Sequence, residues 1–387
     1  MTPRPTIPLP AFLEDISAFY AVEVFQAARL LEARGRSVIH LEFGEPDFPT
    51  PEVVTAAGIE ALQQGHTRYT HSLGIPELRE TICAFHNERY GLALQPEQVL
   101  VSAGTSFLMY LTMLLVLEPG DEVLLADPTY ACYANFVRLA RGVPVPVPIR
   151  ESEGFQLDPA AVKARITPRT RALLVCSPAN PTGVVMRPEV MQALAGLGVP
   201  IVSDEIYHGL SYGGRCQSLL EFSERVFVLN GFSKFFAMTG WRLGYLIFPP
   251  ELMPTVMRLH QNLMISPPDF PQYAAIAAMT KAVPVCEGYV REYDRRRLYV
   301  IERLGRMGLP LRYEPAGAFY VFANASHIEP DSLKLSLAIL NEAGVALTPG
   351  FDFGAGGEGY LRFSYANSLE NLREALDRLE AWLGRRR

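Results

Sequence analysis

The sequence predicts an α/β fold: a mostly parallel sheet flanked by helices, with a smaller α+β domain built from both chain ends. Three observations predict it. Short apolar runs rich in β-formers alternate with helical patterns through the middle of the chain. A length of 387 residues is too great for one small core. Polar residues recur where the apolar runs end, which is where open α/β sheets bind ligands.

The composition excludes several classes of protein. Hydrophobic residues make up 49% of the chain and charged residues 20%, as in ordinary globular proteins. A net charge of −6 without a long basic run argues against a nucleic-acid partner. No apolar run is long enough for a membrane span, and the proline-rich start at residues 1–5 lacks a signal-peptide core. The 5 scattered cysteines predict reduced thiols in the cytoplasm and no metal site.

The first elements precede the predicted sheet. A helix is expected from about Ile16, and residues 38–43 look like a short strand. Thr50 and Pro51 are expected to begin the next helix, with Thr50 as its cap. A further helix is predicted at residues 76–90.

The sheet itself is predicted from a series of short apolar segments. The expected strands are residues 98–102, 122–126, 143–148, 172–176, 199–203, 226–229 and 244–248, with an apolar helix at 107–117. Prolines interrupt the run at 143–148, which is typical of an edge strand.

The C-terminal part contains a long helical stretch at residues 272–307, in which Pro284 is expected to cause a kink or a break. We place the domain boundary inside this stretch. The large domain is then residues 45–285, and the small domain is residues 1–44 with 286–387. The remaining expected elements are strands near 311–313, 318–322 and 360–364 and helices near 332–343 and 369–383.

Lys234 stands just after the apolar run at residues 226–229, which reads as a buried strand. An amine at that place can be partly desolvated, which lowers its pKa and makes it a nucleophile toward a carbonyl. Arg242 is close behind and supplies a permanent cation that can hold a phosphate. A Schiff-base lysine beside such an arginine is what pyridoxal phosphate requires. A lone lysine after a strand is more often a solvated loop residue. The interpretation of Lys234 as a Schiff-base lysine therefore depends on the rest of the chain.

Further polar or special residues stand at the other predicted strand ends. They are Gly104, Thr105, Tyr130, Asn180, Asp204 and Tyr207. Taken singly, each is explained as a turn, a cap or a core residue. Together with Lys234 they supply an amine, a glycine turn for phosphate, an aromatic ring, hydroxyl and amide donors, and a carboxylate. Position at strand ends alone does not explain that combination.

The chain resembles the fold-type I pyridoxal-phosphate enzymes and, within them, the class I/II aminotransferases. The matching stretches are residues 43–48, Tyr69 with Gly74 and residues 78–79, residues 180–183, residues 204–207, Ser233-Lys234 with residues 240–244, and residues 361–364. They span almost the full length in the order of the family.

The resemblance implies pyridoxal 5'-phosphate as cofactor and assigns the residues around its ring. Lys234 forms the Schiff base and later moves the proton. Asp204 pairs with the ring nitrogen and keeps it protonated. Tyr207 and Asn180 donate to the phenolate oxygen, and Tyr130 stacks on the ring.

The resemblance also assigns the phosphate and substrate contacts. The phosphate is held by Ala103, Gly104, Thr105, Ser233 and Arg242, with Tyr69 reaching the phosphate of a neighbouring subunit. That last contact implies a homodimer with shared active sites. The substrate carboxylate is bound by Arg362, with Gly44 and Asn180 assisting.

Two positions depart from the family pattern. Gly231 stands where many relatives have a serine that contacts phosphate, so phosphate binding is expected to depend more on Arg242. Thr105 aligns where some aspartate-using relatives carry a lysine. The segment expected over the site offers Ile16, Phe19 and Tyr20 instead of a cation. We therefore expect a neutral amino donor, apolar or aromatic.

Three functions are compatible with the shared motifs to different degrees. An aminotransferase moves an amino group from an L-amino acid to a 2-oxo acid and is the first choice. The alternative is a β-eliminating carbon–sulfur lyase, which the shared motifs do not separate from it. A pyridoxal-binding transcription regulator would need a DNA-binding domain ahead of the fold, and Gly44 stands too near the start for one to be expected.

Overall fold

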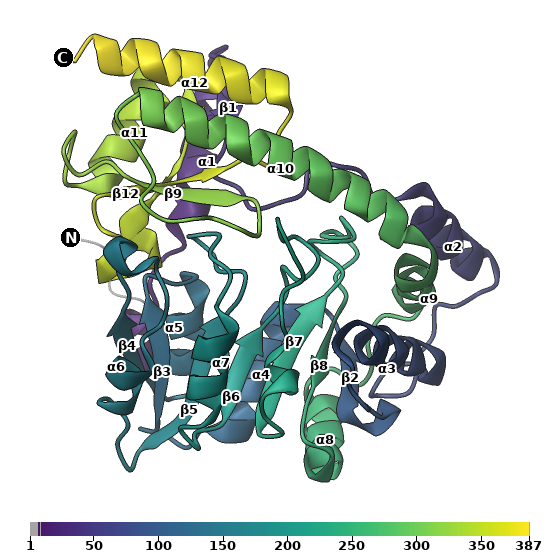
Figure 1. Cartoon of the computed structure of the whole chain (residues 1–387). Helices are drawn as coiled ribbons and strands as arrows, with labels where there is room; N and C mark the ends of the chain where they lie inside the picture. The colour runs from purple at the N-terminus through teal and green to yellow at the C-terminus, as the bar shows by residue number, and fades with distance from the viewer. Residues whose placement is uncertain (1–6, 8, 387) are drawn as a thin grey trace.

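The computed structural model describes residue 7 and residues 9–386, so the expectation for residues 1–5 lies outside the described part. A seven-stranded sheet with the order β2-β8-β7-β6-β5-β3-β4 forms the centre of the larger part (Figure 1). Its strands are β2 (Val99–Ser102), β3 (Glu122–Asp127), β4 (Val143–Pro148), β5 (Thr170–Cys176), β6 (Ile201–Asp204), β7 (Val226–Gly231) and β8 (Gly244–Ile247). Only β8 runs antiparallel to its neighbours β2 and β7. The prediction of a mostly parallel α/β sheet is confirmed.

The strand sequences explain the layered core. Every residue of β2, β6, β7 and β8 is buried, as expected for strands covered on both faces. In β5, Leu173 and Val175 pack into one core cluster, and Ala172 and Leu174 pack into the other. This alternation follows from the two-residue period of a strand.

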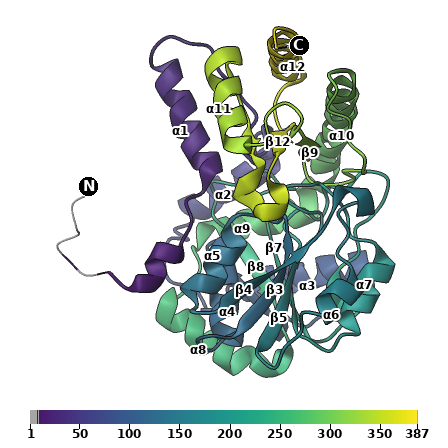
Figure 2. The ribbon, with the colours of Figure 1, turned by 90° about the vertical axis from the view of Figure 1, so that its left-hand side faces the viewer.

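Helices cover both faces of the sheet (Figure 2). They are α2 (Glu52–Gln63), α3 (Pro76–Tyr90), α4 (Thr105–Val116), α5 (Cys132–Leu139), α6 (Pro159–Lys163), α7 (Pro188–Ala195), α8 (Met253–Leu263) and α9 (Phe270–Ala277). Residues of α4, α5 and α8 belong to one core cluster, and residues of α3, α6 and α7 belong to the other.

The proline-containing strand β4 lies at the edge of the sheet, as predicted. Its valines and prolines alternate, and the N–H of Val143 donates to the Asp121 carbonyl at 2.7 Å. The prolines, which lack an N–H, stand at the positions between the valines, so their missing donors do not interrupt the pairing with β3.

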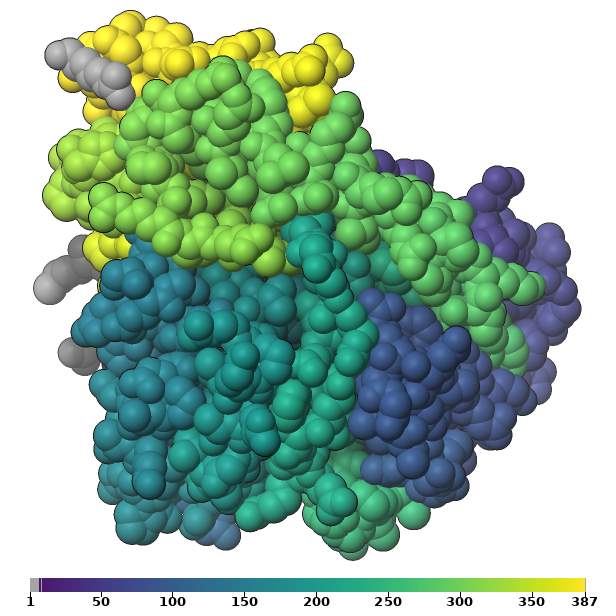
Figure 3. All heavy atoms as spheres, in the orientation of Figure 1, coloured from purple at the N-terminus to yellow at the C-terminus, as the bar shows by residue number. Residues whose placement is uncertain are grey.

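Two smaller sheets lie outside the central one, and the first of them joins the two chain ends. Strand β1 (Ile39–His40) pairs with β10 (Val345–Ala346), and β11 (Thr348–Pro349), β12 (Tyr360–Ser364) and β9 (Tyr320–Asn324) form the other sheet. The helices here are α1 (Tyr20–Glu32), α10 (Val283–Arg306), α11 (Ser332–Ala343) and α12 (Leu369–Gly384). On the face seen in Figure 3, the C-terminal segments lie directly on the segments of the central sheet. The division into residues 45–285 and the remainder stays a prediction.

Short 3₁₀ turns connect the main elements. They are η1 (Ala11–Asp15), η2 (Pro96–Gln98), η3 (Glu151–Glu153), η4 (Leu219–Glu221), η5 (Pro250–Leu252), η7 (Gly350–Phe353) and η8 (Ala355–Gly357). Within the described range, no helix is both long and apolar enough to cross a membrane.

The long helical stretch is interrupted just before Pro284. A π-helical segment, η6 (Ala278–Ala282), separates α9 from α10, and Pro284 then lies in the first turn of α10. A proline is tolerated there because the N–H it lacks has no partner in the first turn. The predicted break is therefore present, with the proline starting the second helix.

Three local expectations are wrong. Residues 311–313 form no strand, because the backbone N–H of Arg312 donates to Glu151 Oε1 at 2.9 Å instead of to a ladder. The helix expected from Ile16 begins at Tyr20, after η1. Thr50 is not the cap of α2, since Pro51 holds that position. The Thr50 hydroxyl donates to the Ala237 carbonyl at 2.6 Å and accepts from Trp241 Nε1 at 3.1 Å.

Candidate active site

A cavity of about 310 Å³ lies at the carboxyl ends of the central strands, where the smaller sheets meet them. The predicted residues that line it are Gly44, Thr105, Tyr130, Asn180, Asp204, Tyr207, Ser233, Lys234, Arg242 and Arg362. Ala103 and Gly104 precede α4 in the chain and do not line the cavity directly. Tyr69 lies outside it, with 81% of its surface exposed.

Lys234 follows β7 and points its amine into this cavity. Its Nζ donates to the Gly44 carbonyl at 2.5 Å. Burial lowers the pKa of Lys234 to about 8, opposed by the charge of Glu45 and helped by that of Arg362. A larger fraction of this amine is neutral near pH 7 than in an ordinary lysine, so it is a better nucleophile.

Asp204 ends β6 and is only 7% exposed. Its Oδ2 accepts from the Tyr133 hydroxyl at 2.7 Å, and its Oδ1 accepts from the Ile206 amide at 3.1 Å. Burial raises the pKa of this carboxyl, while both hydrogen bonds oppose the rise. No cation of the described chain forms an ion pair with it, so the carboxylate suits a cationic ring nitrogen of a ligand.

Sequence reasoning missed Tyr133. This residue comes three positions after Tyr130, and the two rings meet edge to face with centroids 5.2 Å apart. The available signal was the spacing itself, since residues three apart lie on one side of a helical turn.

Tyr207 is buried and shares a hydrogen bond of 2.9 Å between its hydroxyl and that of Tyr320. Sequence reasoning also missed Tyr320, the first residue of β9. A Cβ built on Gly44 would collide with the Tyr320 hydroxyl, so Gly44 is required by this close approach. Nothing in the local pattern around Tyr320 indicated that contact.

Arg362 lies in β12 and is 2% exposed. Its Nη1 donates to Asn180 Oδ1 at 2.9 Å, and its Nη2 donates to the Glu42 carbonyl and to Thr348 Oγ1. Its Nε has no hydrogen-bond partner, and no carboxylate of the described residues pairs with it. A buried guanidinium in this state is suited to receive the carboxylate of a ligand.

Gly104 and Arg242, both expected to hold the phosphate, lie close together where β2 ends and α4 begins. Gly104 has a φ of +91°, and a Cβ there would lie 2.7 Å from Arg242 Nη2. Arg242 Nη1 donates to the Thr239 carbonyl at 3.0 Å. A helix N-terminus beside a guanidinium attracts an anion. Ser106, in the first turn of α4, also lines the cavity and was missed.

The departure at Gly231 has a structural reason. A Cβ on Gly231 would lie 3.0 Å from Gly244 Cα and 3.1 Å from the Leu243 carbonyl oxygen. The backbones of β7 and β8 therefore approach too closely here for a serine without a shift.

The segment before α1 covers one side of the cavity. Phe19 lines it and meets Tyr130 edge to face, with centroids 5.9 Å apart. The amides of Tyr20 and Ala21 donate to the Asp352 carboxylate, which fixes the start of α1. Of the expected covering residues, Phe19 lines the cavity, whereas Ile16 and Tyr20 do not.

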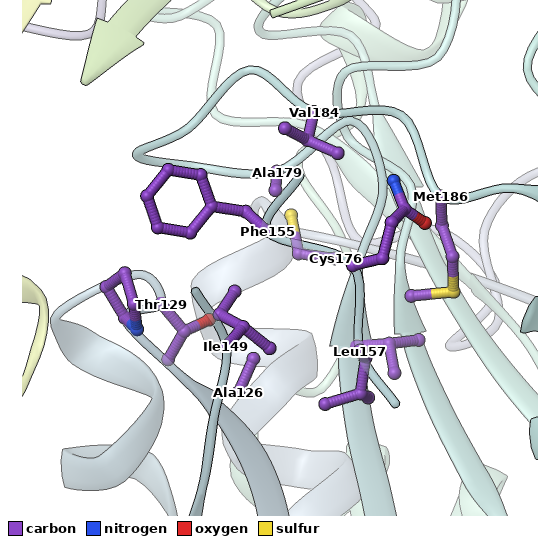
Figure 4. A pocket seen from close by; sticks show the side chains of 12 residues that line it. Ala126, Thr129, Ile149, Phe155, Leu157, Cys176, Ala179, Val184 and Met186 are labelled. Atoms are coloured by element: carbon purple, nitrogen blue, oxygen red, sulfur yellow. The ribbon is translucent and has the colours of Figure 1, made fainter. Parts of the chain in front are cut away.

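A second, smaller cavity of about 30 Å³ has Cys176 and Ala179 among its lining residues (Figure 4). Of the described residues that line it, none carries a charge, and most are apolar, including Phe155 and Leu157. Nor do the described residues contain a group of three or more His, Cys, Asp or Glu side chains that could hold a metal. The chemistry is therefore concentrated in the larger cavity.

Comparison with known proteins agrees with this geometry. A family model described as aminotransferase class I and II matches residues 36–379. The chain is 43% identical over 368 residues to the aspartate/prephenate aminotransferase of Thermus thermophilus, covering 92% of this chain and 94% of that one. It is 39% identical over 378 residues to the (5-formylfuran-3-yl)methyl phosphate transaminase of Methanocaldococcus jannaschii, covering 96% and 99%.

Solved structures give the same result. The Thermus thermophilus aspartate aminotransferase with maleate superposes with a TM-score of 0.92 at 39% identity, covering 97% of this chain and all of that one (100%). An aminotransferase from Mycobacterium tuberculosis gives a TM-score of 0.93 at 36% identity, covering 98% and 100%.

The site fits the cofactor of this family on three observations. Asp204 is a buried carboxylate with no ion-pair partner among the described residues, Gly104 leaves room beside Arg242, and Lys234 presents an amine with a lowered pKa. The chain belongs to the class I and II aminotransferases and is a pyridoxal-phosphate-dependent transaminase.

Proposed function

We propose that this transaminase moves the amino group of a neutral, apolar or aromatic L-amino acid to a 2-oxo acid such as 2-oxoglutarate or pyruvate. The observation that carries the proposal is the set of cations around the cavity. Among the described lining residues these are Lys234, Arg242 and Arg362. Lys234 and Arg242 are assigned to the cofactor, which leaves Arg362 for one substrate carboxylate.

A second carboxylate on the donor would lack a partner. An unpaired charge in a closed site is costly, so an acidic donor needs its own cation. The lining of the cavity also contains Phe19, Tyr130 and Glu45. An aromatic wall and a negative charge favour an apolar side chain over an acidic one.

The chain's own residues would hold the cofactor and handle the proton. Asp204 would stabilise a protonated ring nitrogen, and Tyr207 with Asn180 would donate to the ring oxygen. The helix start at Thr105 and the guanidinium of Arg242 would hold the phosphate. The cofactor supplies an electron sink for the bond that breaks at the substrate Cα.

Lys234 is the group placed to move the proton. Its Nζ reaches the Gly44 carbonyl, and its lowered pKa lets it accept a proton from the substrate Cα near neutral pH. Arg362 would orient that substrate through its carboxylate, and the ring of Tyr130 would exclude water from one face.

The names of the relatives cover several amino donors and 2-oxo acids. They include aspartate and prephenate for the Thermus protein, valine and pyruvate for a Mycobacterium tuberculosis relative, and aromatic amino acids for a Thermococcus litoralis relative. All of these are named as aminotransferases, which supports transamination over β-elimination. The proposal of a neutral amino donor therefore rests on the residues that line the cavity.

We also propose a cytoplasmic homodimer with shared active sites. Tyr69 is a large aromatic residue that is 81% exposed and lies outside the cavity of its own chain. That position supports a role at the phosphate of a second subunit.

The test is a panel of amino donors. We expect kcat/KM for leucine, methionine or phenylalanine to exceed that for aspartate and glutamate. A preference for aspartate of about tenfold or more over every neutral donor would overturn the substrate proposal, since it requires a cation that pairs with the second carboxylate. Incubation with cystathionine without a 2-oxo acid should release no pyruvate, and release would favour the lyase.

A further inference from the structure

A chain of three ionisable side chains lies beside Arg362 and takes no part in the chemistry above. Glu42 is fully buried at 0% exposure, and its Oε1 lies 2.7 Å from His40 Nδ1. On the other side of the ring, His40 Nε2 lies 3.2 Å from Oε1 of Glu32, the last residue of α1. Glu42 Oε2 has no hydrogen-bond partner within the described part of the chain. One imidazole thus joins two carboxylates from different elements.

This arrangement favours a protonated ring. Ionised carboxylates only accept hydrogen bonds, and the imidazolium has the two N–H groups that donate to both of them. The contact with Glu42 raises the pKa of His40, and Glu32 raises it further, whereas burial opposes both. The hydrogen bond between His40 and Glu32 lowers the pKa of Glu32.

Glu42 also holds the substrate-binding arginine through its backbone. Its carbonyl oxygen accepts from Arg362 Nη2 and, at 2.9 Å, from Thr348 Oγ1. The side chain of Glu42 is therefore anchored by His40 while its carbonyl receives the guanidinium. If the contact between His40 and the Glu42 side chain is lost, the Glu42 carbonyl oxygen that accepts from Arg362 moves.

We propose that His40 is a positioning residue which, acting through Glu42, holds Arg362 in the orientation that receives the substrate carboxylate. His40 does not line the cavity, so it acts without touching substrate. A neutral side chain at this position leaves the buried charge of Glu42 without a cation, and water does not reach it. The local backbone then shifts, and carboxylate binding weakens while proton movement at Lys234 continues.

The experiment measures binding of 4-methylpentanoate, a carboxylate with an apolar tail and no amine, as an inhibition constant of the holoenzyme. We expect His40→Gln to raise this constant, and the KM for leucine, by about tenfold, with kcat changed by less than about twofold. The matched control is His327→Gln, because His327 is exposed. This variant should change neither the inhibition constant nor the KM for leucine. The double variant His40→Gln with Glu42→Gln removes the buried charge and should recover most of the lost affinity.

A second readout does not involve the cofactor. His40 has its pKa raised above the usual 6.5, so its stabilising effect is fully present below that pH and is lost as pH rises through the folded value. The charged groups facing it are Glu42 and Glu32, with Arg29 bonded to Glu32 at 2.8 Å. The apoprotein of wild type should therefore exceed His40→Gln in Tm at acidic pH, and the difference should shrink at alkaline pH.

The inference rests on the proposed role of Arg362, and one further variant separates the two. If Arg362→Leu leaves the inhibition constant unchanged, both the proposed function and this inference are wrong. If Arg362→Leu weakens binding strongly but His40→Gln does not, the inference alone is wrong. A His40→Gln protein with a lower Tm and an unchanged inhibition constant would likewise overturn it, because His40 would then only stabilise the fold.

Discussion

Replacing Asp204 with asparagine removes one buried charge and leaves the shape of the site almost unchanged. The asparagine carbonyl can keep the 3.1 Å contact with the Ile206 amide. Its NH₂ group can donate to the Tyr133 hydroxyl oxygen, which lies 2.7 Å from the present carboxylate. We therefore expect Asp204→Asn to fold normally and to keep a Tm close to that of wild type.

The expected loss is large because no cation of the described residues forms an ion pair with this carboxylate. Burial raises the pKa of Asp204, and the two hydrogen bonds compensate only in part. Removing one partner of a buried ion pair costs about 3–5 kcal/mol, and each 1.4 kcal/mol is about tenfold. We expect the cofactor dissociation constant to rise by roughly two to three orders of magnitude.

The assay is a titration of the apoprotein with pyridoxal phosphate, followed by absorbance. Tyr133→Phe is the matched control, because it removes one hydrogen bond to Asp204 and keeps the charge. It should weaken cofactor binding by roughly tenfold or less. Cofactor affinity of Asp204→Asn within about threefold of wild type would refute the reasoning, and so would a Tyr133→Phe variant as impaired as Asp204→Asn.

Three further predictions concern the amine and the assembly. Lys234→Ala should fold with an unchanged Tm and lose turnover, and a rate within about tenfold of wild type would contradict its role. Because burial lowers the pKa of Lys234 to about 8, the rate at which apoprotein captures pyridoxal phosphate should rise with pH and level off above that value, whereas a flat profile would count against a buried amine. Mixing inactive Lys234→Ala with an inactive Tyr69→Ala protein should restore activity in hybrid dimers, and an active monomer by light scattering would exclude a shared site.

The predicted site residues that line the cavity lie there because they stand at strand ends. Asp204 and Lys234 each follow a buried apolar run, and parallel strands bring such positions to one edge of the sheet. The edge position of β4 was also readable, since prolines cannot donate in the middle of a sheet. In these cases the local sequence pattern is enough to predict where the residue or strand lies in the fold.

The residues that sequence reasoning missed depend on how separate elements pack. Tyr320 reaches the site because β9 brings it against Gly44, and no local pattern encodes that approach. Thr50 has the composition of a helix cap, but its hydroxyl is used by Ala237 and Trp241, which are nearly two hundred positions away. A capping rule considers only neighbours in sequence, so it cannot detect this competition.

The pairing of the chain ends has a consequence for the order in which the enzyme becomes functional during synthesis. The contact between Arg362 and the Glu42 carbonyl joins residues 320 positions apart. The strands of the central sheet, β2 to β8, are complete well before β12 is translated. A nascent chain can thus assemble Asp204 and Lys234 while it still lacks Arg362, which we propose binds the substrate carboxylate. Competence for the cofactor should precede competence for the substrate, and a chain that ends before β12 should acquire only the first.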